Sequence, residues 1–207
     1  MVYVGIIDYG MGNLHSVAGA LSALGARCFV SSSPEELARA DKLVLPGVGA
    51  FPDAMRALRD AGLVEFIKEQ AKLKPLLGIC LGMQLLFEKS HEFGMTEGLG
   101  LLAGEVVRLT ERPSKEYKIP HMGWNSLCYT KWAKDCALLY GIPEGEHVYF
   151  VHSYRAVCGE PDTLAAYSEY GDEVAAVVCS GNVFGTQFHP EKSACVGLMM
   201  LENFLKL

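Results

Sequence analysis

Short, continuously apolar runs alternate with helix-like stretches over the first two-fifths of the chain, and this alternation strongly constrains the fold. The expected strands are residues 3–7, 28–30, 42–45 and 75–79. Leu14, Val17 and Leu21 recur at helical spacing between the first two strands. A second helical stretch spans residues 52–72 and is expected to break at Gly62. Strands that are apolar on both faces need helices on both sides, so the pattern predicts a parallel sheet inside three layers.

The second half of the chain is rich in strand-like segments that lie close together in the sequence. These segments are residues 105–109, 147–154, 163–168, 174–179 and 183–188. The turn Ser180-Gly181-Asn182 is typical of a β-hairpin, so antiparallel strands are expected to extend the parallel core. Ser193 is expected to cap a final helix. Without a linker or an internal repeat, the sequence predicts a single α/β domain over residues 1–207 with one mixed sheet.

Composition and charge exclude several classes of function. The chain of 207 residues has a formal net charge of -6 and no run of Lys or Arg, so nucleic acid is not an expected partner. No apolar run approaches the roughly 20 residues of a membrane span. Seven cysteines without a CxxC pair indicate free thiols in a cytoplasmic protein. No metal-ligand spacing is present, and His15 interrupts the only candidate dinucleotide motif, so neither metal nor cofactor is expected.

The strongest local signal is the pentapeptide Gly78-Ile79-Cys80-Leu81-Gly82, where the fourth expected strand meets a helical stretch. This is the glycine–x–nucleophile–x–glycine pattern of a nucleophile elbow, with cysteine in place of serine. Such a turn presents the thiol at a helix N-terminus, which favours a thiolate, and the N–H of Leu81 can donate to an oxyanion. A buried structural cysteine remains the alternative, because short elbow-like matches also occur by chance.

A thiol nucleophile needs a general base, and the base needs a group that orients it. The segment Phe188-His189-Pro190-Glu191 offers both at the end of the last expected strand. Residues two apart in extended chain point the same way and Pro190 stiffens the segment, so His189 and Glu191 are expected to face one cleft. A solvated His-x-Glu at a strand end is the alternative. The combination with an elbow cysteine favours the catalytic interpretation.

A turn with two glycines, Pro46-Gly47-Val48-Gly49, follows the third expected strand. Loops at the carboxyl ends of neighbouring parallel strands line one crevice, so this turn is expected beside the elbow. Its backbone N–H groups could form the second wall of an oxyanion hole. A flexible turn without such a role remains the alternative.

Together these motifs resemble the class I (triad) glutamine amidotransferase family. Residues 78–84 are similar to its nucleophile motif and residues 188–191 to its His/Glu motif. Three further stretches, residues 8–14, 46–49 and 120–125, resemble the glutaminase subunits of imidazole glycerol phosphate synthases, a branch of this family. The resemblance covers nearly the whole chain and implies a three-layer, flavodoxin-like fold with a mixed sheet.

The resemblance also implies a mechanism. The Cys80 thiolate attacks the side-chain amide of L-glutamine, His189 takes and returns the proton, and Glu191 orients His189. Ammonia leaves, and water hydrolyses the glutamyl thioester to glutamate. The implied oxyanion hole consists of Gly47, Val48 and Leu81. The implied glutamine pocket consists of Gly49, Gln84 and, at the strand end 151–154, Ser153 and Tyr154.

The resemblance implies a partner as well. In this branch of the family, a (β/α)8-barrel cyclase subunit receives the ammonia and forms imidazole glycerol phosphate for histidine biosynthesis. A screened path keeps the ammonia from being protonated in water. The implied partner face consists of Met122, Trp124, Tyr149 and Lys192. From the sequence alone, Met122 and Trp124 could equally be core residues.

Two alternative functions remain open. One is the glutaminase of an amidotransferase acting in anthranilate, aminodeoxychorismate or guanylate synthesis; few residues follow His189, so a fused synthase domain is not expected. The other is a redox or chaperone-like protein with an elbow cysteine and no amidase activity.

The glutaminase interpretation also leads to a hypothesis on regulation. The turn at residues 46–49 is expected to be preorganised only when the partner binds its own ligand, so the isolated subunit is expected to be nearly inactive.

Overall fold

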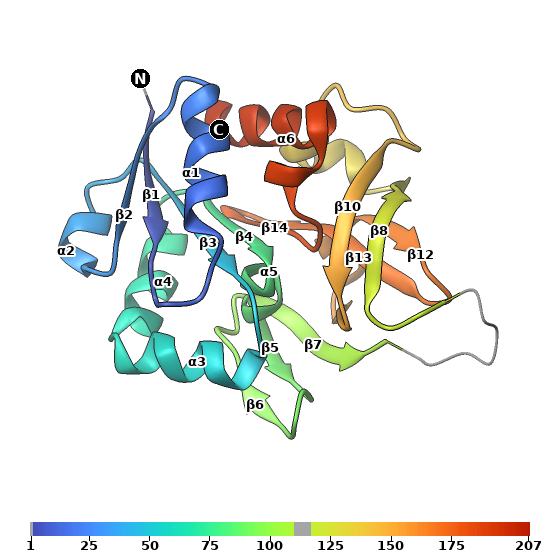
Figure 1. Ribbon diagram of the computed structural model, residues 1–207, viewed down its shortest axis with the longest axis horizontal. Coiled ribbons are helices and arrows are strands. Elements are labelled where there is room, and N and C mark those ends of the chain that lie inside the picture. The colour runs from blue at the N-terminus through green and yellow to red at the C-terminus, as the bar shows by residue number, and fades with distance from the viewer. Residues whose placement is uncertain (1, 110–116) are drawn as a thin grey trace.

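An eight-stranded mixed sheet forms the centre of the computed structural model, which describes residues 2–109 and 117–207 (Figure 1). Five strands pair in parallel: β2 (Arg27–Ser31), β1 (Tyr3–Ile7), β3 (Lys42–Gly47), β4 (Leu76–Cys80) and β14 (Val183–Thr186). The sheet continues antiparallel through β13 (Glu173–Ser180), β12 (Leu164–Glu169) and β9 (Cys128–Tyr129). The parallel part has the 2-1-3-4-5 order of flavodoxin-like sheets, which confirms the expected fold class.

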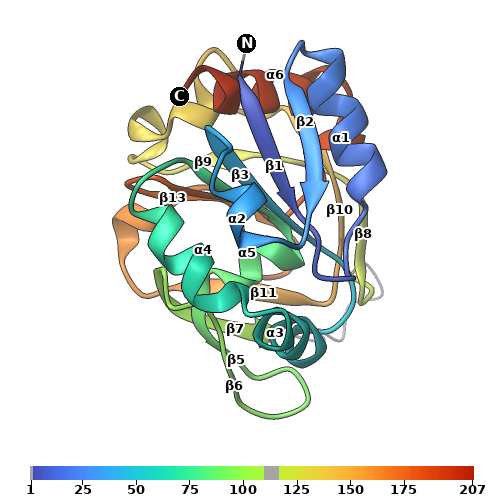
Figure 2. The same cartoon turned by 90° about the vertical axis from the view of Figure 1, so that its left-hand side faces the viewer.

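Helices cover both faces of this sheet (Figure 2). One face carries α1 (Leu14–Ala23) and α6 (Ala194–Lys206); the other carries α2 (Pro34–Leu37), α3 (Phe51–Asp60) and α4 (Leu63–Ala71). Strand residues alternate between the two cores as the pleat requires: Val44 packs with α1 and α6, whereas Leu43 and Leu45 pack with α3 and α4. The expected break at Gly62 is confirmed, since its φ of 68° separates α3 from α4.

Two smaller sheets lie beside the main one. The first pairs β8 (His121–Ser126) with β10 (His147–His152), and the second has the order β11 (Tyr154–Cys158), β7 (Leu102–Arg108), β5 (Phe87–Ser90), β6 (Thr96–Glu97). The expectation of one sheet is therefore wrong for these strands. The expected strand at residues 147–154 bends at Ser153, and its halves join different sheets. Strand pairing depends on distant partners, which a local pattern does not report.

Short helical turns occupy the remaining connections. They are α5 (Leu81–Leu85), η1 (Ala133–Asp135), η2 (Ala137–Leu139), η3 (Pro161–Thr163) and η4 (Pro190–Lys192). Ser193 precedes α6 as expected, but its hydroxyl does not cap the helix. It donates to the carbonyl of His189 (2.7 Å) and accepts from the N–H of Tyr149 (3.0 Å), so it ties η4 to β10. No helix within residues 2–109 and 117–207 is long and apolar enough to cross a membrane.

Candidate active site

The nucleophile elbow is formed by the junction of β4 and α5. Cys80 has a φ of 56°, a conformation that non-glycine residues rarely adopt and that is retained at functional sites when packing enforces it. The flanking glycines are required by close packing. A Cβ on Gly78 would lie 2.7 Å from the carbonyl oxygen of Gly82, and a Cβ on Gly82 would overlap the carbonyl oxygen of Leu45. The elbow that the sequence predicted is therefore present, and the strain is held by backbone contacts.

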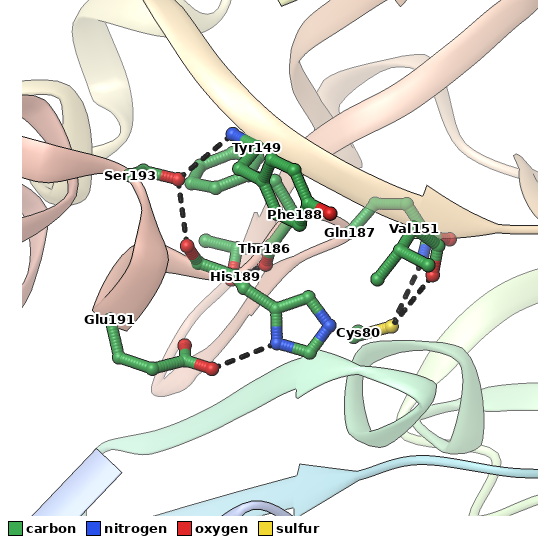
Figure 3. Close-up of polar contacts among 9 residues, drawn as sticks. All are labelled: Cys80, Tyr149, Val151, Thr186, Gln187, Phe188, His189, Glu191 and Ser193. Carbon is green, nitrogen blue, oxygen red and sulfur yellow. Dashed lines mark hydrogen bonds and ion pairs between the residues drawn. The ribbon is translucent and has the colours of Figure 1, made fainter. Parts of the chain in front are cut away.

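The His189–Glu191 pair lies beside this elbow (Figure 3). Nδ1 of His189 is 2.8 Å from Oε1 of Glu191, and both side chains are almost fully buried. A carboxylate can only accept, so Nδ1 carries the proton, and Figure 3 shows the other ring nitrogen on the Cys80 side. The expected route to this geometry is wrong, because β14 ends at Thr186 and Glu191 lies in the 3-10 turn η4. A tight turn, and not an extended strand, brings the carboxylate back to the ring.

The charge state of His189 follows from its two neighbours. Burial by itself lowers the pKa of His189, but the hydrogen bonds and negative charges of Cys80 and Glu191 outweigh burial and raise this pKa to about 9. The ring is therefore an imidazolium at neutral pH, placed between the sulfur of Cys80 and the carboxylate of Glu191. A cysteine nucleophile needs such an acid–base partner beside its sulfur.

Cys80 and His189 open into one cavity of about 390 Å³, a volume in the range of small-molecule sites. Its walls come from six segments of the chain and consist of Val48, Gly49, Cys80, Leu81, Gln84, Glu92, Pro120, Val151, His152, Ser153, Tyr154 and His189. Every expected oxyanion and pocket residue except Gly47 lines this cavity. Gly47 does not line it but lies opposite Cys80 in the β3–β4 register, where a Cβ would meet the N of Gly82 and the hydroxyl of Tyr9.

Two polar side chains that line this cavity, Gln84 and Glu92, carry hydrogen-bond acceptors. Gln84 donates through Nε2 to Tyr154 O and to Gln187 Oε1, both at 2.9 Å, so its Oε1 remains as an acceptor. Glu92 is the one carboxylate among the lining residues; it accepts the N–H of Phe51 at 2.7 Å, and burial raises its pKa. Glu92 was not expected from the sequence. It follows β5 without a recognisable motif, and only the second small sheet brings it to the cavity.

The four expected interface residues lie on or next to the β8–β10 ribbon. Met122 and Trp124 are exposed by 61% and 53%, which rules out the core alternative for both. Tyr149 lies opposite Trp124 across the ribbon, with their ring centroids 6.0 Å apart. Lys192 is exposed on η4. Large exposed apolar side chains gathered on one ribbon are typical of an interaction surface.

No metal centre accompanies the site in the part of the chain that the structure describes. Within residues 2–109 and 117–207, no three His, Cys, Asp or Glu side chains are grouped in a way that could hold a metal ion. All seven cysteines are free.

Comparison with known proteins points to one family. The sequence model described as "Glutamine amidotransferase class-I" matches residues 5–207. The chain is 55% identical to the imidazole glycerol phosphate synthase subunit HisH of Geobacillus thermodenitrificans, over 99% of this chain and 96% of that protein. It is 54% identical to the protein of the same name from Caldanaerobacter subterraneus, over 97% and 96% of the two chains.

Solved structures share the fold at much lower identity. The structure of PurLQS from Thermotoga maritima matches with a TM-score of 0.75 at 21% identity, over 100% of this chain and 99% of the other. The glutaminase domain of Trypanosoma brucei CTPS matches with a TM-score of 0.67 at 17% identity, over 100% of this chain and 94% of the other. At these identities the likeness concerns the fold alone.

Proposed function

The chain belongs to the class I glutamine amidotransferase family, and we propose that it hydrolyses L-glutamine with Cys80, His189 and Glu191 as the catalytic triad. By its nearly full-length similarity to the HisH relatives, it is the glutaminase subunit of an imidazole glycerol phosphate synthase. One observation carries the proposed triad: the elbow thiol and the carboxylate-bound imidazole share a single cavity.

The proposed reaction has two half-reactions. In the first, the Cys80 thiolate forms an S–C bond to the amide carbon of glutamine, and the N–H groups of Val48 and Leu81 hold the oxyanion next to Gly47. His189 gives its proton to the leaving nitrogen, so ammonia departs and a thioester remains. In the second half-reaction, His189 takes a proton from water, whose oxygen displaces the sulfur and yields glutamate.

The proposed substrate orientation follows from charge. Glu92 and the free Oε1 of Gln84 would accept hydrogen bonds from the α-ammonium group of glutamine. Gly49, Ser153 and Tyr154, which line the same cavity, would hold the rest of the amino-acid backbone. This arrangement directs the side-chain amide toward the sulfur of Cys80.

The proposed partner is a (β/α)8-barrel cyclase subunit that takes up the ammonia to make imidazole glycerol phosphate. The relatives are named as subunits, which supports an assembly of this kind. The exposed ribbon with Met122, Trp124 and Tyr149, together with Lys192, is the proposed docking face. We further propose a heterodimer in the cytoplasm, built from one glutaminase domain over residues 1–207 and needing no cofactor.

A labelling and turnover experiment tests this function. Glutamate release is measured for the chain alone and with a barrel cyclase subunit carrying its ribulosyl ligand; near-zero turnover alone and strong turnover in the complex are expected. A glutamine-like electrophile should label Cys80 and none of the other six cysteines. Absence of labelling even in the complex would favour the redox or chaperone-like alternative. Recovery of a different synthase as the stable partner would favour another amidotransferase.

A further inference from the structure

A buried amide, Gln187, contacts the sulfur of Cys80. Its side chain is completely buried, and its Nε2 lies 3.8 Å from Sγ (Figure 3). It does not line the cavity and has no part in the two half-reactions described above. A fully buried amide that touches the nucleophile needs an explanation of its own.

The orientation of this amide is determined by Gln84. The carbonyl oxygen of Tyr154 can only accept, so the group of Gln84 that faces it at 2.9 Å must be the NH2 group. The same NH2 group lies 2.9 Å from the Gln187 amide, which must therefore present its oxygen. The NH2 group of Gln187 is then left for Cys80. Flipping either amide would place two acceptors or two donors against each other.

The sulfur has a second contact of opposite character. Sγ lies 3.8 Å from the carbonyl oxygen of Val151, which can accept a hydrogen bond from a thiol but repels a thiolate. The N–H of Gln187 does the reverse, because a hydrogen bond to sulfur is strongest when the sulfur is charged. The sulfur thus contacts the Val151 carbonyl, which favours the thiol, and the Gln187 amide, which favours the thiolate.

We propose that Gln187 is a positioning residue that donates its side-chain N–H to the Cys80 thiolate and holds the sulfur toward His189, against the repulsion of the Val151 carbonyl. This inference rests on the proposed role of Cys80 as nucleophile. Gln84 belongs to the same series of hydrogen bonds and acts through Gln187. The NH2 group of Gln84 connects the substrate pocket to the Gln187 amide, which supports the nucleophile.

The test is the pH dependence of alkylation of Cys80 by iodoacetamide, followed by peptide mass spectrometry in the full chain. Gln187→Glu keeps an acceptor for Gln84 but no longer donates to sulfur once ionised, and Gln187→Met removes both functions. In Gln187→Met the midpoint of the profile should rise by roughly one pH unit, so the rate falls about tenfold at any pH well below both midpoints. The rise should be larger for Gln187→Glu. The rate at alkaline pH should stay within about twofold.

Cys195 supplies an internal reference, because it is exposed and its profile should not change in either variant. An unchanged midpoint at Cys80 in both variants overturns the role of Gln187. If Cys80 of the unaltered protein reacts no faster than Cys195 at neutral pH, the proposed nucleophile itself is wrong, which is a separate outcome.

A second measurement needs no variant. In the unaltered protein, the side-chain amide protons of Gln187 should shift in NMR spectra with the same pH midpoint as Cys80 alkylation. Amide protons that do not respond to this titration would contradict the proposed hydrogen bond, even if neither variant folds.

Discussion

Two buried histidine sites lie at the same cavity and carry opposite charge preferences. Burial lowers the pKa of His152 to about 3 and that of its neighbour His121 to about 4, whereas the pKa of His189 is raised to about 9. His152 and His189 are similarly buried. Burial therefore does not distinguish them; the groups that face each ring do.

The His121–His152 site is a chain of neutral hydrogen bonds. Nδ1 of His152 donates to Tyr154 O at 2.8 Å, so its Nε2 accepts from Nδ1 of His121 at 3.0 Å. Asn125 completes the chain at Nε2 of His121. A proton added to either ring would place N–H against N–H or against the Asn125 amide.

His189 has the opposite surroundings, because Glu191 accepts from one ring nitrogen and Cys80 faces the other. The acceptors around its ring, and not its place at the cavity, therefore distinguish the proposed general base from His152. His152 also lines this cavity, but its ring is held in hydrogen bonds between neutral groups.

The largest expected effect is on glutaminase kcat, which should distinguish a His189 variant from a His152 variant. In the complex with a cyclase subunit, His189→Asn should lower glutaminase kcat by at least about a thousandfold, because the imidazole moves a proton in both half-reactions. His152→Asn should lower it by less than about tenfold. Steady-state glutamate release measures both. Equal losses in the two variants would remove the distinction between the catalytic and the structural histidine.

Replacing the orienting carboxylate should have the next largest effect. Glu191→Gln keeps an acceptor for Nδ1 but removes the negative charge, so the pKa of His189 should fall and kcat should drop about a hundredfold. Glu92→Gln is the matched control, since it is also a buried carboxylate at this cavity. It should mainly raise the KM for glutamine. NMR titration of the His189 ring checks the pKa, and an unchanged titration would contradict the assigned cause.

The pH dependence of stability should show the two sites with opposite signs. The unfolded chain protonates its histidines near pH 6.5, before folded His121 and His152 do, so stability should fall as pH drops from about 6.5 toward 3. Folded His189 keeps its proton longer than the unfolded chain, so its contribution, roughly 3 kcal/mol, should be lost as pH rises from about 6.5 to 9.

Urea unfolding at each pH checks these signs. His152→Asn should flatten only the acid side of the stability profile, and His189→Asn only the alkaline side. A loss of both slopes in a single variant would show that the two sites are coupled.

The smallest expected effect concerns the support of His189. Ser193 donates to His189 O, and Ser168 is an equally buried serine that donates to Ser126 O at 2.6 Å, far along the sheet. Alanine at either position should lower the free energy of unfolding by about 1 kcal/mol. Only Ser193→Ala should also lower kcat, by a few-fold, because it loosens η4. Equal kcat values in both variants would remove Ser193 from the site.

Several parts of the fold were predictable from local pattern. The four apolar runs became parallel strands, Gly62 ended a helix, and Ser180-Gly181-Asn182 joined β13 to β14. The separate ribbon of β8 and β10 was not predictable, because its pairing joins residues that are distant in sequence. The bend at Ser153 was missed for the same reason: period-two alternation reports a strand but not which sheet it enters.

The sequence by itself determined the local arrangement of the residues that we propose carry the chemistry. Glycines on both sides of Cys80 and the close spacing of His189 and Glu191 are short-range features, and backbone sterics turn them into an elbow and a turn. Only the tertiary structure decided what surrounds them. The carboxylate of Glu92, the amide of Gln187 and the charge of His189 depend on burial and on contacts between distant segments. Desolvation and hydrogen bonding act through space, so no local spacing could report them.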